Sequence, residues 1–79
     1  MKIQLIEGNF EAKEALDILT KLIHVKIKYN EDKINNSINY DEIELRLNRI
    51  KRLQKNLFDI KKHIDAQEGK ITVQSSITI

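Results

Sequence analysis

The stretch IELRLNRIKRLQKNLFDIKKHI, residues 43–64, decides the fold of this 79-residue chain. Counted in heptads, it has apolar side chains at six of its seven a and d positions, which is typical of a helix with a coiled-coil-like seam. The a positions are Ile43, Ile50, Leu57 and Ile64, and the d positions are Arg46, Leu53 and Ile60. Because a second helix is needed to cover such a seam, the sequence predicts a helical pair.

The flanks of this stretch set the bounds of the predicted helix. A polar turn, residues 35–39, precedes it, and Asn39 followed three residues later by Glu42 resembles a capping box. Gly69 is suited to a left-handed cap at the other end. We therefore predict a helix over residues 40–68.

A second helix is predicted from about Phe10 to about Lys33, with Asn9 as its N-cap, because apolar residues recur there at spacings of three and four. Its apolar sector is too wide for one partner helix, which indicates a second contact with a sheet or another subunit. The segment HVKIKY, residues 24–29, alternates as a strand would, but no turn residue separates it from the preceding helix. We favour helix, and a strand there would instead give β-α-β-α-β.

Both ends of the chain have strand patterns. Residues 2–7 place Ile3 and Leu5 on one face and Ile6 on the other, and Gly8-Asn9 ends the strand. Residues 71–79 alternate apolar and polar side chains with one interruption, Ser75. A helical hairpin returns the chain to its starting end, so the two strands should pair antiparallel. The predicted class is α+β, with the order β-α-α-β.

Composition restricts the class of protein. The chain is short, with a net charge of +2, no Cys and no Pro, and we treat residues 1–79 as one small domain. Because a domain of this size has a marginal core and disulfides are excluded, oligomerisation is the expected supplement. No signal peptide and no membrane span is apparent, so we expect a cytoplasmic protein, of bacterial or bacterial mobile-element origin.

No motif in the sequence carries catalytic chemistry. There is no Cys nucleophile and no Gly-rich phosphate loop, and the two His do not form a metal-binding pair. We therefore expect a non-catalytic protein with no cofactor, no metal and no identified small-molecule substrate.

The predicted function is self-association, as a dimer or larger oligomer acting through protein–protein contacts. The uncharged tail is typical of an edge strand that another copy covers. Phe58 lies off the seam and is a further candidate contact. The candidate interface residues are Ile3, Leu5, Phe58, Ile71, Val73, Ile77 and Ile79.

A basic segment, residues 46–55, gives an alternative function. It contains five Lys or Arg residues and no acid, as a nucleic-acid-binding regulator would require. The candidate phosphate contacts are Arg49, Arg52 and Lys55. The five cations fan around the predicted helix without interleaved aromatic residues, so this alternative is not favoured. We expect Arg46, at a d position, to extend past the seam toward the turn or to pair with an acid.

Overall fold

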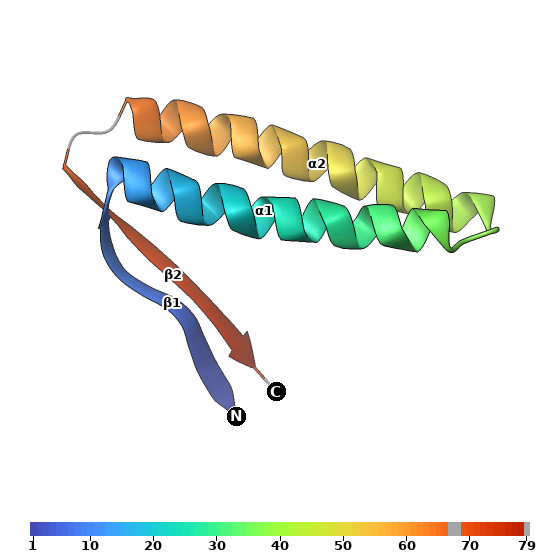
Figure 1. The fold of residues 1–79 in the computed structure, drawn as a ribbon, viewed down its shortest axis with the longest axis horizontal. Coiled ribbons are helices and arrows are strands. Elements are labelled where there is room, and N and C mark those ends of the chain that lie inside the picture. The colour runs from blue at the N-terminus through green and yellow to red at the C-terminus, as the bar shows by residue number, and fades with distance from the viewer. Residues whose placement is uncertain (67–68, 79) are drawn as a thin grey trace.

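The computed structural model describes residues 1–66 and 69–78, which form an α+β arrangement of order β-α-α-β. Strand β1 (Lys2–Glu11) leads into helix α1 (Ala12–Asn35), and a short turn leads to helix α2 (Tyr40–Asp65). Strand β2 (Lys70–Thr78) returns to β1 and pairs antiparallel with it (Figure 1). The predicted class and element order are confirmed.

Residues 24–29 belong to α1, so the alternative with a third strand is wrong. Helix continues through this segment because nothing in it turns the chain, and because Ile23 and Ile27 lie on the side that is at least partly buried. In the helix, the alternating pattern places Val25 and Tyr29 on the exposed surface.

Strand β1 is longer than predicted, and Asn9 is not a helix cap. The strand continues through Gly8 and Asn9 to Glu11, and these residues pair with β2. Asn9 Oδ1 accepts a hydrogen bond of 2.6 Å from the hydroxyl of Thr72, across the sheet. Glu11 stands at the N-cap of α1 without a side-chain cap bond. The long β2 partner outweighs the local turn signal, because pairing satisfies backbone groups that a turn would leave to water.

A bulge at Leu5 changes which side chains share a face of the sheet. Gln4 pairs with Ser76 and Ile6 pairs with Ser75, so Leu5 is the extra residue. As a result Ile3, opposite Ile77, lies on the same face as Ile6. The prediction that Ile6 lies on the opposite face from Ile3 is therefore wrong.

Gly8 lies directly opposite Val73 in this ladder. Its φ of 147° is in the region that favours glycine, whereas a Cβ at this position would make only an ordinary contact, at 3.8 Å, with the ring of Phe10. Gly8 therefore allows β1 to continue with a positive φ at this position, whereas the sequence indicated a turn.

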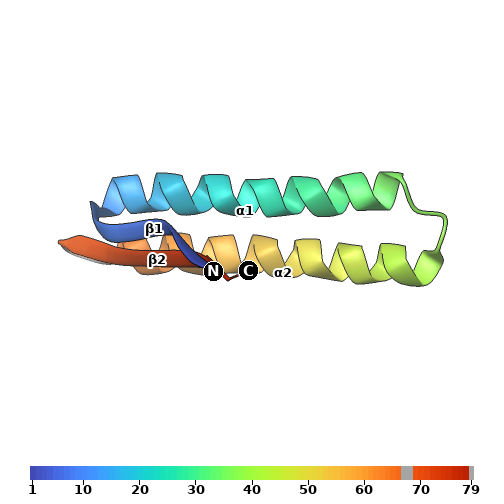
Figure 2. The ribbon, with the colours of Figure 1, turned by 90° about the horizontal axis from the view of Figure 1, so that it is seen from below.

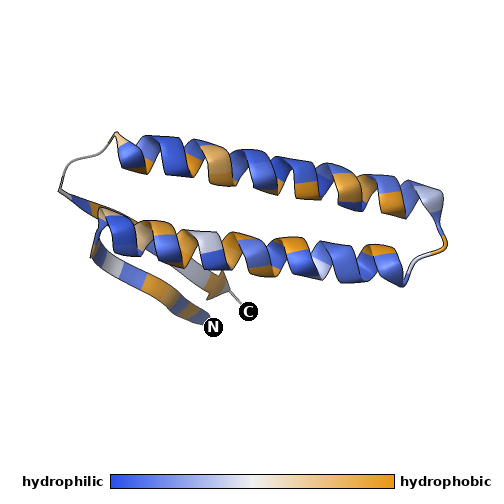
Figure 3. Ribbon diagram, turned by 45° about the horizontal axis from the view of Figure 1, so that its top comes forward, coloured by the Kyte–Doolittle hydropathy of each residue, from blue (hydrophilic) through white to orange (hydrophobic). Residues whose placement is uncertain are grey.

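The two helices pack along the predicted seam. All seven a and d residues of α2 are buried or half-buried, and Ile50, Leu53 and Ile64 are the most buried in the helix. Figure 3 shows apolar residues along the facing sides of the two helices. The heptad register counted from the sequence therefore identifies the side of α2 that packs against α1.

The ends of α2 follow the predicted signals in part. Asn39 Oδ1 accepts from the backbone N–H groups of Asp41 and Glu42, as an N-cap should. Glu42 does not complete a capping box, because its carboxylate accepts from the Ser37 hydroxyl instead. At the other end the helix stops at Asp65, and Ala66 is the C-cap. Gly69, with φ of 85°, lies beyond that cap and immediately precedes β2, so its predicted capping role is wrong.

The core lies where the sheet packs against α1, next to the C-terminal end of α2. Ala15 of α1, Ile64 of α2 and Val73 of β2 are buried together. The half-buried side chains around them are Ile6, Phe10, Ala12, Leu16, Leu19, Ile60 and Ile71. From this junction the sheet diverges from the helical hairpin, so that the start of β1 and the end of β2 lie away from the helices (Figure 1). Seen from below, the strands run along the length of the hairpin toward its middle (Figure 2). Within the described ranges, neither helix has an apolar run long enough to cross a bilayer.

Candidate functional sites

The sheet offers two open edges, and they differ in character. It has only two strands in the described part of the chain, so each strand has one unpaired side. Strand β1 contains the bulge residue Leu5 and carries charged residues, whereas β2 has no extra residue and no charge after Lys70. Bulges and charges discourage pairing with another chain. The β2 edge is therefore the one suited to accept another strand.

The face of the sheet near the strand termini is apolar and open. Ile3 is 42% exposed and Ile77, its partner across the ladder, is 39% exposed. The bulge residue Leu5 is also exposed. Apolar residues at this end project beyond the core, because the sheet has already diverged from the helices (Figure 1).

The other candidate interface residues lie in different settings. Val73 and Ile71 belong to the core cluster of the chain, where Val73 is buried and Ile71 half-buried. Phe58 is 66% exposed on α2. Ile79 lies outside the described residues. Of the predicted set, Ile3, Leu5, Ile77 and Phe58 therefore keep apolar surface available for contact.

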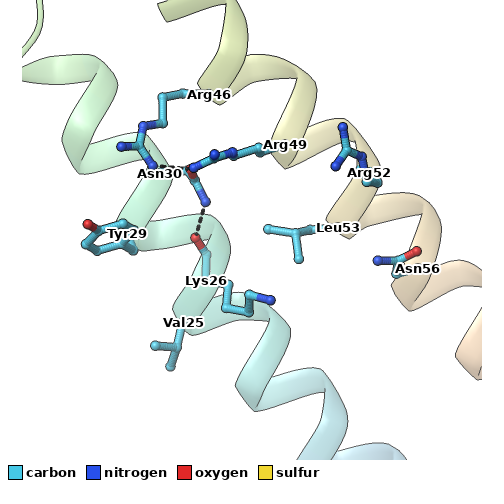
Figure 4. A pocket seen from close by; sticks show the side chains of 9 residues that line it. All are labelled: Val25, Lys26, Tyr29, Asn30, Arg46, Arg49, Arg52, Leu53 and Asn56. Carbon is cyan, nitrogen blue, oxygen red and sulfur yellow. Dashed lines mark hydrogen bonds between the residues drawn. The ribbon is translucent and has the colours of Figure 1, made fainter. Parts of the chain in front are cut away.

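A second candidate site is a groove of about 540 Å³ between the two helices, called here the interhelical groove. Four of its lining residues are cations and none is an acid; the cations are Lys26, Arg46, Arg49 and Arg52. The rest of the lining is apolar, aromatic or amide in character, and consists of Val25, Tyr29, Asn30, Leu53 and Asn56. Figure 4 shows these side chains, which come from both α1 and α2, with Asn30, Arg49 and Leu53 between the two helices.

One end of the groove is built around a polar pair. Asn30 is only 6% exposed, and its amide nitrogen donates to the backbone carbonyl of Lys26 at 2.8 Å. Its carbonyl Oδ1 accepts from Arg46 Nη1 at 3.2 Å (Figure 4). Arg46 therefore pairs with an amide on α1, and the expected contact with an acid or with the turn is wrong. Its Nε–H is buried and makes no hydrogen bond within the described part of the chain.

Tyr29 adds an aromatic surface beside this pair. The guanidinium carbon of Arg46 lies 5.7 Å from the centre of the Tyr29 ring, and Lys33 Nζ lies 5.5 Å from it. Both distances are within the range of cation–π attraction. Arg46 is thus held by the ring and by Asn30 together.

The basic segment is divided by the fold. Arg49 and Arg52 enter the groove lining beside Arg46, and none of the three forms an ion pair within residues 1–66 and 69–78. Lys55 does not line the groove, and its Nζ lies 3.0 Å from the carboxylate of Asp59. The structure thus brings together two of the three predicted phosphate contacts and separates the third.

Sequence reasoning missed the α1 side of this groove. Asn30 occupies a position in the apolar stripe of α1, and Arg46 occupies one in the seam of α2. The sequence does contain one indication of the groove, because both residues are polar at helical positions that are otherwise apolar. In the structure these two side chains pair with each other.

Among the described residues, no three His, Asp or Glu side chains converge as metal ligands would. Comparison with protein-family models, with curated proteins and with solved structures finds no significant match.

Proposed function

We propose that this protein is a non-catalytic, self-associating protein that acts through protein–protein contacts, with the β2 edge and the open end of the sheet as its interface. The observation that carries the proposal is the sheet, which has two strands in the described part of the chain and an open β2 edge with no charge after Lys70. Three or more strands are usually needed for an independently stable sheet. Pairing with a second copy at β2 gives a sheet of four strands.

The amount of exposed surface supports the same proposal. The chain exposes 6365 Å², whereas a compact monomer of 9.3 kDa exposes about 5,000 Å². Its radius of gyration is 15.1 Å, against about 12 Å for a compact chain of this length. No large side chain among those described is fully buried. Association would cover part of this excess.

A twofold axis suits the β2 edge. Antiparallel pairing of β2 with β2 of a second copy is isologous, because each strand offers the other the same edge. Such pairing places the two copies of Ile77 on one continuous apolar face together with the two copies of Ile3. The resulting strand order would be β1-β2-β2-β1, with the bulged β1 strands at both outer edges.

The test uses lysine at the β2 edge. Gln74 and Ser76 are exposed on the face opposite Val73, and Gln74 pairs with Glu7, so Gln74→Lys/Ser76→Lys should leave the subunit fold intact. Across a twofold axis these lysines would lie near their own copies and repel. We expect light scattering to report a dimer or larger oligomer for the natural chain and a monomer for this variant.

The matched control is Asn48→Lys/Gln54→Lys, which adds the same charge at exposed positions of α2. This control should associate as the natural chain does, and circular dichroism should show helix content unchanged in both variants. A folded, monodisperse monomer of the natural chain at micromolar concentration would overturn the proposal.

A further inference from the structure

The interhelical groove has features that self-association at the sheet does not use. It gathers three arginines and one lysine, with no acidic side chain in its lining. Bringing like charges together without a counter-charge is unfavourable, and a bound anion removes that cost. The groove volume, about 540 Å³, is in the range of sites for small organic ligands.

We propose that the interhelical groove binds a small organic phosphate, with the phosphate groups held by Arg49, Arg46 and Arg52 and the apolar or aromatic part of the molecule on Tyr29, Val25 and Leu53. A nucleoside diphosphate is a molecule of this class. This site is separate from the sheet interface and does not depend on it.

Phosphate is the anionic group that this set of donors favours. The guanidinium group presents paired N–H donors in a planar fork that matches two phosphate oxygens, and it stays charged at every physiological pH. Three of the four groove cations are arginines, and they are spaced three residues apart on α2 (Figure 4). A diphosphate offers enough oxygens to engage more than one fork.

Arg46 is positioned before any ligand arrives. The Asn30 carbonyl and the Tyr29 ring hold its guanidinium, so little side-chain freedom is left to lose on binding. Its place in the seam supports a role in binding, because a leucine there would continue the apolar packing of the helices. Polar residues that interrupt an otherwise consistent pattern are expected at functional positions.

A nucleic acid fits the groove less well than a small molecule does. Binding along a phosphate backbone needs a basic surface that extends over several phosphates, whereas Lys55 is paired with Asp59 outside the groove. The lining is also part apolar and part aromatic, which is typical of small-ligand sites.

Calorimetric titration of the full chain with adenosine diphosphate, at physiological ionic strength, tests the proposal. We expect one molecule bound per chain, and we expect adenosine diphosphate to bind about tenfold or more tightly than either pyrophosphate or adenosine alone. Arg49→Glu should weaken binding by about tenfold or more. The matched control, Lys51→Glu, changes the same charge on an exposed residue outside the groove and should alter affinity by less than about twofold.

In NMR spectra, the chemical-shift changes that adenosine diphosphate causes should be confined to groove residues. This result would distinguish binding in the groove from nonspecific attraction of an anion to a basic protein. Undetectable binding of adenosine diphosphate would overturn the proposal, as would equal weakening by Arg49→Glu and Lys51→Glu. Pyrophosphate that binds as tightly as adenosine diphosphate would overturn the role of Tyr29 and its apolar neighbours. A short DNA duplex that binds more tightly, with a steep salt dependence, would identify a nucleic-acid surface instead.

Discussion

Asn30 and Arg46 are the residues at which this fold departs from an ordinary helical seam. A partly buried guanidinium loses hydration that hydrogen bonds must replace, and here the amide of Asn30 supplies one of them. Removing one partner leaves the other with an unsatisfied polar group. Replacing both with apolar side chains removes the polar groups together, which is often neutral or stabilising.

This predicts a strong coupling between the two positions. Asn30→Leu and Arg46→Leu should each lower the free energy of unfolding by about 1–3 kcal/mol. The double variant should be within about 1 kcal/mol of the natural chain, or more stable than it. Urea denaturation of all four proteins measures the coupling free energy as a double-mutant cycle. Additive losses in the double variant would show that the pair is not coupled.

At the scale of elements, the seam of α2 carries the packing between the helices. Leu53 is among the most buried side chains of that helix, while Leu57, one turn further along the seam, is half-buried. Because cavity formation adds to lost burial, the cost of truncating a seam residue should follow how deeply it lies.

Leu53→Ala should therefore lower the free energy of unfolding by about 2–5 kcal/mol, which is a large part of the total stability of a small domain. Leu57→Ala should lower the free energy of unfolding by less, because the half-buried Leu57 side chain has less buried apolar surface to lose. Lys51→Ala, on the exposed side of the same helix, should cost less than about 0.5 kcal/mol. Thermal denaturation ranks the three variants, and equal shifts would place the packing of α2 on a different face.

At the scale of the whole molecule, the sheet and the helical hairpin share one small core and then diverge (Figure 1). The open end of the sheet therefore adds exposed apolar surface without adding to the core of the chain. If a second copy covers that surface, folding and association are coupled and stability depends on protein concentration.

The melting temperature should accordingly rise with concentration. For a dimer that folds as it associates, a hundredfold increase in concentration should raise the melting temperature by roughly 5–10 °C. Gln74→Lys/Ser76→Lys should melt at a temperature that does not depend on concentration. A melting temperature of the natural chain that is constant over the same range would contradict coupled folding and association.

The sequence by itself determined the type and order of the elements and the packed side of α2. Heptad spacing over residues 43–64 and alternation near both ends are local patterns, and each reflects which side chains of one element face the core. Their positions along the chain then require the strands to pair antiparallel, because a helical hairpin brings the chain back to where it began.

Tertiary structure decided the features that depend on contacts between distant residues. Gly8 and Asn9 resemble a turn in sequence, yet they extend β1 because β2 offers Val73 and Thr72 as partners. The bulge at Leu5 likewise exists only in relation to the ladder. Asn30 and Arg46 come from different helices, and neither shows by itself that the other will meet it. The local sequence pattern determines which type of element forms and which of its sides is apolar. Strand register, the bulge and the interhelical groove depend on contacts between elements.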